Sequence, residues 1–480
     1  MARTSVVVVG AGLSGLAAAW ELTGGAGGPD EHTPRVEVIE ANDRVGGPLT
    51  TAVFADRTVD LGPDGFLARR PEAVTLIREL GWGDHLEAIG ARGAWIWMRG
   101  ALWELPAGLV MGVPTSAAAL GSLGGLSWRA RIHARRDELF PRRLRVGNDC
   151  TIGHIVRTKL GAELAYRLVE PMIGGIQAGR IDELSARSVY PPLFDAARRG
   201  GSLMRALRPP PTNAASSEGP LFYSLVEGLG ALPGELARQL AERGVVVRTG
   251  ARVSALRRTS QGDYPWEVDT ADTTTGANAV ILATPASVSG ELLAHLDPDL
   301  AALTGLTGAG AAMVTLRYAR ERRSLPIRGT GVLIPLATPW SGGDAMMVTA
   351  LTLLDRKWAH LAREADVLVR AHVGRSDDQR WRALSDEDLV ARVARETNEV
   401  LGGDPCPVLE SLVQRWPEGV PQYRVGHHAL VADARRAGAA HGVSLVGNSY
   451  DGVGIPASVG SGRTGARDVL FQLRGAVAPH

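Results

Sequence analysis

A group of residues near the start of the chain has the types and spacing that bind a phosphate. They form a GxGxxG pattern made of Gly10, Ala11, Gly12, Leu13, Ser14 and Gly15. Glycine at the three fixed positions permits a tight turn, a close approach of the backbone to a pyrophosphate, and close packing of the following helix. Glu40 lies 25 residues beyond Gly15, and its carboxylate is the expected acceptor for ribose hydroxyl groups. These residues predict a site for a dinucleotide.

The neighbouring residues predict the elements that must hold this turn in place. Ser5–Val9 predicts a buried strand, and Leu13–Leu22 predicts a helix of small and apolar residues. Val36–Ile39 predicts a second strand, which follows a loop at 23–34 and ends at Glu40. Strand, helix and strand together make a βαβ unit, and the N-terminus of its helix stabilises phosphate charge.

The rest of the chain predicts a mixture of helices and strands without an internal repeat. Leu229–Arg243 predicts a helix, Ala279–Ala283 a strand, and Asp386–Leu401 an amphipathic helix. The segments near 311–317 and 367–373 have β character.

The composition argues against several classes of protein. The 480 residues suffice for two or three domains. A net charge of +1 argues against a nucleic-acid-binding protein, which is usually strongly basic. Cys150 and Cys406 provide neither a disulfide framework nor the spacing of a metal site, and they fit a reducing, cytoplasmic compartment. Glycines near the N-terminus interrupt the apolar run that a signal peptide needs.

An apolar segment followed by an arginine-rich one predicts a surface that contacts a membrane. No charged residue occurs between Glu104 and Arg129, but Pro106, Pro114 and several glycines argue against a spanning helix. Seven arginines follow from Arg129 to Arg145. This combination is typical of a protein that lies peripherally on the inner face of the cell membrane. A solvated helix face and a contact between the subunits of a homodimer are the alternatives.

Longer segments of the sequence are similar to a known enzyme family. Residues 40–47 (EANDRVGG) resemble the ExxxRxGG segment of flavin oxidoreductases related to amine oxidases. A closer resemblance, to the oxygen-dependent, FAD-containing porphyrinogen oxidases, is carried by residues 59–71 (VDLGPDGFLARRP), 168–191 (LVEPMIGGIQAGRIDELSARSVYP), 415–423 (RWPEGVPQY) and 447–463 (GNSYDGVGIPASVGSGR). These segments follow the family's order over nearly the whole chain.

The resemblance implies an α/β fold with three parts. The first is a Rossmann-like FAD-binding domain, discontinuous in sequence and made of residues 1–60, 220–290 and 430–480. The second is a mixed-sheet α+β substrate domain made of residues 61–90, 196–219 and 291–429. The third is a mostly helical insertion at 91–195, which carries the surface expected to meet the membrane.

The resemblance also implies a reaction. It is the FAD- and dioxygen-dependent six-electron oxidation of coproporphyrinogen III to coproporphyrin III, with release of hydrogen peroxide, in haem biosynthesis. Protoporphyrinogen IX oxidase is the alternative. A flavin amine oxidase is a more distant one, because many of those enzymes use a lysine near the flavin or a C-terminal cysteine, and this chain has two lysines and no cysteine beyond Cys406. No catalytic base and no metal ligand is assigned.

Binding positions of the family can be carried over to this sequence. The expected FAD contacts are Gly10, Ala11, Gly12, Leu13, Ser14, Gly15, Glu40, Ala41, Arg44, Gly47, Gly62, Pro63, Asp64, Val253, Trp416, Gly447, Val453, Gly454 and Ile455. The expected substrate contacts are Arg69 or Arg70, whose guanidinium suits a propionate, and Gly175. The alternative for Arg69 and Arg70 is that they form a solvated arginine pair before a helix. Near Gly175, Gln177 and Arg180 replace the family's common Tyr and Asp.

The glycine-rich turn at 447–456 raises the question of a second nucleotide site near the C-terminus. We interpret it as part of the first site. Val443–Val446 would be a strand of the same sheet as Ser5–Val9, and the turn would pass the ribityl and ring end of the same FAD. The following helix would then direct its N-terminus at the flavin, where it stabilises negative charge.

Overall fold

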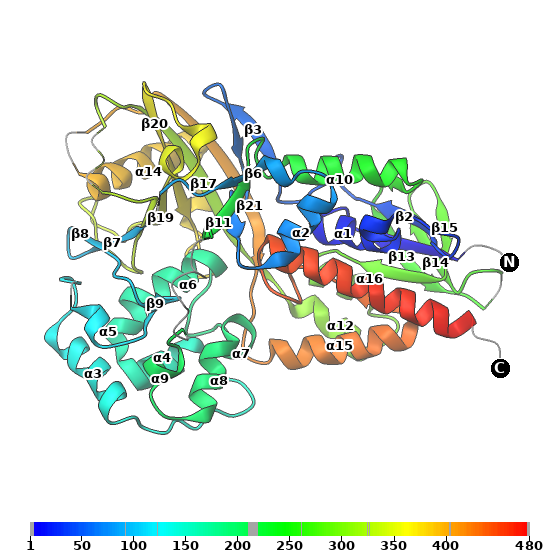
Figure 1. Cartoon of the computed structure of the whole chain (residues 1–480), viewed down its shortest axis with the longest axis horizontal. Helices are drawn as coiled ribbons and strands as arrows, with labels where there is room; N and C mark the ends of the chain where they lie inside the picture. Colours follow the sequence, from blue (N-terminus) through cyan, green and yellow to red (C-terminus); the bar gives the residue numbers. More distant parts are fainter. Residues whose placement is uncertain are drawn as a thin grey trace.

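The structure is a computed structural model that describes residues 4–91, 93–121, 123–209, 219–260, 262–323, 325, 327–402 and 405–477. Its elements form three regions, which Figure 1 shows. A parallel-sheet region contains the segments nearest both chain ends, and a mixed-sheet region lies beside it. A helical region lies against the mixed-sheet region.

The parallel-sheet region contains a five-stranded sheet in the order β12-β2-β1-β16-β22. All its pairings are parallel, with Val7 opposite Glu37 and Val280. The central strand β1 is buried along its whole length, because both faces of the sheet are covered. The strands are β1 (Ser5–Val9), β2 (Arg35–Ile39), β12 (Val246–Arg248), β16 (Ala279–Leu282) and β22 (Val443–Leu445).

Alternate side chains of β1 belong to two different cores. Val6 and Val8 pack against four helices, α1 (Leu13–Leu22), α2 (Pro71–Glu79), α10 (Ala231–Glu242) and α16 (Ile455–Val477). Val7 and Val9 face a small antiparallel sheet and three helices on the other side. These are β13 (Val253–Arg258), β14 (Trp266–Thr270), β15 (Thr274–Ala277), α11 (Ala286–Leu293), α12 (Pro298–Ala301) and α15 (His427–His441).

The mixed-sheet region contains a seven-stranded sheet in the order β21-β17-β20-β19-β18-β7-β8. The pair β18–β7 is parallel and the other pairs are antiparallel. One face is covered by α14 (Asp386–Leu401), through Leu389, Val393 and Val400. The strands are β7 (Ala94–Met98), β8 (Ala101–Glu104), β17 (Gly308–Ala319), β18 (Gly331–Leu333), β19 (Val348–Leu353), β20 (Asp366–Val373) and β21 (Glu410–Pro421).

The helical region has its own core, which also includes Ile96 of β7 and contacts Leu333 of β18. Among the described residues, no helix is long and apolar enough to cross a membrane. The elements are β9 (Leu109–Val110), β10 (Val113–Pro114), α3 (Trp128–Leu139), α4 (Ile152–Leu160), α5 (Ala162–Leu164), α6 (Glu170–Gln177), α7 (Ala186–Val189), α8 (Pro191–Arg199) and α9 (Leu203–Ala206).

Smaller elements join the parallel-sheet and mixed-sheet regions. The hairpin of β3 (Thr51–Phe54) and β4 (Arg57–Asp60) packs through Phe54 and Val59 on Trp358, which follows α13 (Leu354–Lys357). A three-stranded sheet lies close by, made of β5 (Phe66–Leu67), β11 (Phe222–Leu225) and β6 (Leu86–Ala88).

The expected α/β fold class is confirmed, and the expected elements are present. α1 and α14 have the predicted bounds, and the helix expected at Leu229–Arg243 is α10. The range 91–195, expected for the helical insertion, also contains β7 and β8, which belong to the seven-stranded sheet. The domain boundaries stay a prediction.

Candidate functional site

The glycine-rich turn after β1 is shaped to admit a ligand. A Cβ atom at Gly15 would lie 1.9 Å from the carbonyl oxygen of Gly10, so only glycine lets the turn and α1 pack together. Among the described residues, no atom lies within 4 Å of the place that a Cβ atom would take at Gly12. α1 begins at Leu13, and no described side chain caps it. Its first N–H groups are therefore available to a diphosphate.

Glu40 is fixed at the end of β2 beside this turn. Its side chain is buried, and Oε2 accepts a hydrogen bond from the backbone N–H of Ala11 at 2.8 Å. Oε1 accepts one from the backbone N–H of Asn42 at 2.9 Å. The backbone N–H of Ala251 donates to the carbonyl of Glu40 at 2.8 Å. This bond brings the start of β13, and with it Val253, to the same end of the sheet.

The segment 44–47 returns to the glycine-rich turn. The backbone N–H of Gly46 donates to the carbonyl of Ala11 at 2.8 Å, and Gly46 forms a parallel bridge with Gly12. The Arg44 guanidinium is exposed and donates to the carbonyl of Gly47 at 2.8 Å. The structure therefore places Arg44 and Gly47 beside the turn that was expected to bind the same diphosphate.

The C-terminal glycine-rich turn lies against the N-terminal one. The backbone N–H of Val446 donates to the carbonyl of Leu282, so β22 leads the chain to the edge of the sheet where β1 ends. A Cβ atom at Gly447 would lie 3.7 Å from Ser14 Oγ, and one at Gly462 only 2.1 Å from the carbonyl oxygen of Ser14. Both turns thus border one space, which favours one cofactor over two.

The segment Gly62–Asp64 connects this space to the mixed-sheet region. A Cβ atom at Gly62 would lie 2.1 Å from the carbonyl oxygen of Pro48, which places Gly62 directly beside the end of the 44–47 segment. The indole N–H of Trp416 in β21 donates to the carbonyl of Leu61 at 3.1 Å. Trp416 and Gly62–Asp64 are therefore brought together, although they are far apart in sequence.

Asp64 is held in an ion pair inside this connection. Lys357 Nζ lies 2.8 Å from Oδ1 of Asp64, and the Trp358 indole N–H donates to Oδ2 at 3.2 Å. Burial alone would raise the pKa of the Asp64 carboxyl, but Lys357 and Arg370 hold it well below its usual value. Asp64 is therefore ionised at neutral pH.

One face of the seven-stranded sheet forms the floor of the candidate substrate site. The strand registers place five residues in one cross-strand row, in the order Leu333, Ala350, His372, Met313 and Gln414. All five are half-buried, whereas the side chains on the other face are buried under α14. A half-buried row in the middle of a sheet is a surface that a ligand can cover.

His372 lies at the centre of this floor. Its Nε2 is 3.1 Å from the hydroxyl oxygen of Thr352. Burial, assisted by the charge of Arg370, lowers the pKa of His372 to about 4. The imidazole is therefore neutral at physiological pH, and it presents a polar but uncharged surface.

Helix α6 of the helical region lies over this floor. A Cβ atom at Gly175 would lie 3.9 Å from Leu333 Cδ2, the nearest described atom. Gly175 is exposed, so the absence of a side chain leaves space between α6 and the sheet. The structure therefore places Gly175 at the wall of the candidate substrate site.

Of the two departures from the family pattern, Arg180 fastens α6 to its surroundings through its side chain, whereas Gln177 does so through its backbone carbonyl. The carbonyl of Gln177 accepts a hydrogen bond from Gln422 Nε2 at 2.7 Å. Arg180 lies 3.1 Å from the buried carboxylate of Glu170 and 2.6 Å from that of Asp377. The charge of Arg180 is thus engaged in linking α6 to the mixed-sheet region.

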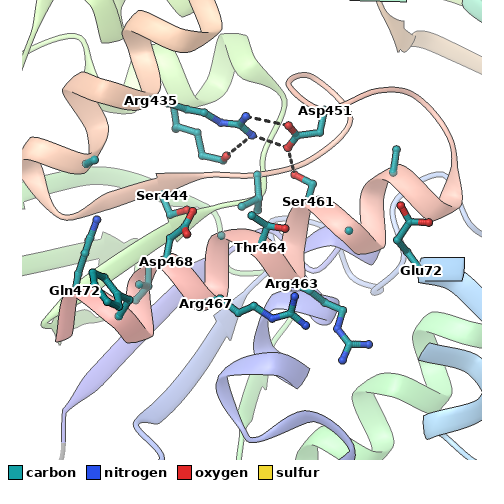
Figure 2. Close-up of a pocket in the computed structure, with 18 of the residues that line it drawn as sticks. Glu72, Arg435, Ser444, Asp451, Ser461, Arg463, Thr464, Arg467, Asp468 and Gln472 are labelled. Carbon is teal, nitrogen blue, oxygen red and sulfur yellow. Dashed lines mark hydrogen bonds and ion pairs between the residues drawn. The ribbon is translucent and has the colours of Figure 1, made fainter. Parts of the chain in front are cut away.

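The structure separates Arg69 from Arg70. The Arg70 guanidinium donates to Glu72 Oε1 at 2.6 Å and lines the cavity that Figure 2 shows, on the side of α2 and α16. Burial raises the pKa of the Tyr190 hydroxyl in the helical region, and the charge of the exposed Arg69 opposes that rise. Among the described residues Arg69 makes no ion pair, whereas Arg70 pairs with Glu72, so of the two Arg69 is the candidate for the substrate.

Comparisons with known proteins agree with this geometry. Residues 13–470 match the family described as flavin containing amine oxidoreductase. The chain is also 32% identical to coproporphyrinogen III oxidase of Bacillus subtilis (strain 168), over 98% of this chain and 99% of that protein. The chain belongs to the flavin-containing amine oxidoreductases, and to the porphyrinogen oxidases among them. The chain is therefore a flavoenzyme, and its cofactor is FAD.

Two further relatives of this flavoenzyme support the same family. Protoporphyrinogen oxidase of Macaca fascicularis is 30% identical over 98% of this chain and 99% of that protein. The crystal structure of a putative protoporphyrinogen oxidase from Exiguobacterium sp. 255-15 superposes with a TM-score of 0.84 and 30% identity, over 98% of this chain and all of that one.

The residues of this flavoenzyme fit FAD. The open Cα of Gly12 and the uncapped start of α1 suit a diphosphate, and the buried carboxylate of Glu40 suits a ribose. Sequence reasoning missed the floor of the sheet, because cross-strand rows depend on registers between distant strands. It also missed the contact of Lys357 with Asp64, for which the sequence offers no local signal.

Proposed function

We propose that this flavoenzyme oxidises coproporphyrinogen III to coproporphyrin III and releases hydrogen peroxide. The observation that carries the proposal is the identity to the Bacillus subtilis coproporphyrinogen III oxidase, which extends over nearly the whole of both chains. The substrate loses six electrons and six protons, and three molecules of dioxygen accept them as three molecules of hydrogen peroxide. When bound, the flavin supplies the hydride acceptor that dioxygen reoxidises.

The assignment of cofactor contacts follows the geometry of the site. The glycine-rich turn and Arg44 would hold the diphosphate, Glu40 a ribose, and Val253 the adenine side. Gly62–Asp64, Trp416 and the turn from Gly447 to Ile455 would hold the ring end. Each group lies beside the next through the contacts described above, which supports one continuous binding surface.

The floor of the sheet suits a porphyrinogen macrocycle. The faces of the macrocycle are largely hydrocarbon, its centre holds four pyrrole N–H groups, and its rim carries anionic propionates. Leu333, Ala350 and Met313 offer an apolar surface, and His372 adds no charge because its pKa is about 4. Arg69 could pair with a propionate through two parallel hydrogen bonds. The chain would thus orient the ring and exclude water from the reacting face.

Protoporphyrinogen IX is the second candidate substrate, and the similarity to the macaque protoporphyrinogen oxidase favours it. The two substrates differ at two positions of the rim, where coproporphyrinogen has propionates and protoporphyrinogen has vinyl groups. A site that places cationic side chains at these two positions prefers coproporphyrinogen III, because protoporphyrinogen IX would leave those cations without carboxylate partners.

A direct kinetic comparison tests the proposal. Each porphyrinogen is prepared without oxygen, mixed with the enzyme in aerated buffer and followed by porphyrin fluorescence and peroxide release. We expect kcat/KM to be about tenfold higher for coproporphyrinogen III, with three peroxides per porphyrin. Equal or greater kcat/KM for protoporphyrinogen IX would assign the second substrate instead. Oxidation of neither would exclude both.

The surface of α3 and the segment after it supports a further proposal, a peripheral contact with an anionic membrane. Trp128 is 66% exposed and Phe140 75% exposed, and Ile132 and Leu139 are exposed between them. The exposed cations around them are Arg129, Arg135, Arg136, Arg142, Arg143 and Arg145. Apolar side chains with arginines around them are suited to the headgroup boundary of a bilayer. Figure 1 places α3 at the end of the molecule opposite the far end of α16.

Liposome flotation tests this surface. We expect the enzyme to float with vesicles that contain anionic lipid at low salt, and to float less at high salt because salt screens the arginines. Trp128→Ala combined with Phe140→Ala should abolish flotation. Phe471→Ala is the matched control, because Phe471 is 80% exposed on α16. Wild-type enzyme that stays with the soluble fraction at low salt would contradict the proposal, and a dimer by sedimentation would favour the subunit contact.

A further inference from the structure

Tyr423, just after β21, makes two hydrogen bonds to the glycine-rich turn that precedes α16. Its hydroxyl donates to the carbonyl of Asn448 and accepts from the backbone N–H of Gly452 at 2.9 Å. The side chain is only 2% exposed, and its ring stacks on His427 with 4.2 Å between ring centroids. The phenol is therefore fixed in place, and both of its hydrogen-bonding functions are used by the turn.

The same turn is fixed from its other side by a polar chain that Figure 2 shows. Arg435 of α15 donates to both carboxylate oxygens of Asp451. The Ser461 hydroxyl in α16 donates to Asp451 and accepts from the backbone N–H of Gly447 at 2.8 Å. Arg435 also donates to the carbonyl of Leu445 at 3.2 Å. Residues 445–452 are thus connected to α15 and α16 through side chains.

Two cavities border this part of the turn. The one in Figure 2 has a volume of about 910 Å³ and lies among α2, α15, α16 and β22. The second, of about 920 Å³, lies between α15 and the helices α7 and α8 and is lined by Tyr423 and Gly452. Arg435 and Asp451 line both cavities. Val446 and Tyr450 pack into the cores, and on the sides that the cavities border the polar contacts add to this packing in holding the turn.

The backbone of Tyr423 is itself anchored to the helical region. Its carbonyl accepts a hydrogen bond from the backbone N–H of Ser185 at 2.8 Å. The Ser185 hydroxyl donates to Asp149, whose Oδ2 also accepts from the backbone N–H of Gly426 at 3.0 Å. Tyr423 therefore stands where the mixed sheet, the helical region and the turn before α16 meet.

We propose that Tyr423 is a positioning residue for the flavin, acting through the turn at 447–455. The phenol holds this turn in its binding conformation before FAD arrives, so that FAD binding does not have to order it. Asp451 and Ser461 do the same from the other side. The inference rests on the assignment of this turn to the flavin end of FAD, and it is independent of which porphyrinogen is the substrate.

Tyr423→Phe tests the proposal, because it removes only the hydroxyl and keeps the ring on His427. We expect the Kd of FAD, measured by titrating apoprotein with FAD, to rise about tenfold. The visible circular dichroism of the bound flavin should change, and kcat should fall while KM for porphyrinogen changes by less than about twofold. Tyr318→Phe is the matched control, since Tyr318 is fully buried and its hydroxyl has no hydrogen-bond partner among the described residues.

A merely structural role for Tyr423 gives a different result. The variant apoprotein would then melt at a lower temperature, with the FAD Kd within twofold of wild type and an unchanged flavin spectrum, and the proposal would be wrong. A wild-type enzyme that does not oxidise porphyrinogen would refute the proposed function. The FAD measurements would still test the role of Tyr423.

Wild-type hydrogen exchange keeps the proposal testable even if Tyr423→Phe does not fold. A turn held by Tyr423 and Asp451 should already protect the backbone N–H groups of Gly447 and Gly452 in the apoprotein. Rapid exchange at both groups in the apoprotein, with protection only after FAD is added, would show that the cofactor orders the turn and would overturn the proposal.

Discussion

Lys357 and Asp64 form an ion pair that is mostly buried, with 2.8 Å between Nζ and Oδ1 and with 17% and 18% of the two side chains exposed. The pair connects α13 of the mixed-sheet region to the Gly62–Asp64 segment beside the candidate flavin site. The Lys357 ammonium also lies 5.3 Å from the Trp358 ring centroid and 6.0 Å from that of Phe222. Its charge is thus surrounded by one carboxylate and two aromatic faces.

Lys357→Met should destabilise the enzyme strongly. The substitution keeps the length of the side chain but removes the cation that pairs with Asp64, which leaves only the Arg370 charge and the Trp358 N–H to stabilise the carboxylate. We expect a loss of about 3 kcal/mol in the free energy of unfolding. Denaturant unfolding of the FAD-bound enzyme measures it. Arg238→Met is the control, because Arg238 is 55% exposed and pairs with Glu235 and Glu242 on the surface of α10. That variant should unfold like wild type.

A second substitution distinguishes the loss of the Lys357–Asp64 ion pair from the loss of side-chain packing. Asp64→Asn added to Lys357→Met removes the uncompensated charge, so the double variant should be more stable than Lys357→Met alone. The alternative result is that the double variant is less stable than Lys357→Met by as much as Asp64→Asn alone destabilises the wild-type enzyme. In that case the two side chains do not act as a pair.

Arg69→Ala and Arg70→Ala should differ in their effect on substrate binding. The Arg70 guanidinium is engaged by Glu72, whereas the exposed Arg69 makes no ion pair among the described residues. Loss of a charge-assisted contact of about 1.5–3 kcal/mol predicts that Arg69→Ala raises KM by one to two orders of magnitude. Arg70→Ala should change KM by less than about twofold. Steady-state kinetics with coproporphyrinogen III decides, and the opposite order would assign the propionate to Arg70.

Elements with a strong local pattern could be predicted from the sequence. α1 and α14 have the predicted bounds, since glycine or serine at the start and a consistent apolar spacing define them locally. The twelve-residue strand β21 could not be predicted, because it contains Pro417, Gly419 and Pro421. It is an edge strand of the seven-stranded sheet, where residues without a backbone N–H are tolerated.

The candidate site also contains parts that could be predicted from neighbouring residues in the sequence and parts that depend on distant ones. The glycine-rich turn and Glu40 could be identified from spacing, because β1, α1 and β2 are consecutive and bring them together. The floor of the substrate site could not, because β17 to β21 pair in an order that differs from the chain order. The hairpin of β7 and β8 also enters this sheet through a parallel pair with β18, more than 200 residues away, which no local pattern indicates.

His372→Trp should block the floor of the substrate site without affecting the cofactor. His372 is half-buried in the row with Ala350 and Met313, so a larger ring there would occupy space that the macrocycle needs. We expect kcat/KM to fall at least about tenfold, with the FAD Kd unchanged. Ser411→Trp serves as the control, because Ser411 is exposed on β21 of the same sheet. Unchanged kinetics of His372→Trp would place the substrate elsewhere.

The titration of His427 and that of Asp60 should change the free energy of unfolding in opposite directions as the pH falls. Burial, together with the neighbouring His428, lowers the pKa of His427 to about 4 from 6.5. The unfolded chain therefore binds more protons between those values, and the free energy of unfolding falls as pH drops through this window, by up to about 1.4 kcal/mol per pH unit. Burial raises the pKa of Asp60 from 3.8 to about 6. The folded chain then binds more protons in that range, which stabilises it as pH falls.

Two variants separate these contributions in unfolding experiments from pH 7 to pH 4. His427→Phe keeps the ring on Tyr423 and removes the titrating group, so its stability should decline less with acid than that of wild type. Asp60→Asn removes the opposing carboxyl, so its stability should decline more steeply, relative to its own value at pH 7. A His427→Phe curve parallel to wild type would mean that the imidazole keeps its ordinary pKa in the fold, because only a shifted group changes the slope.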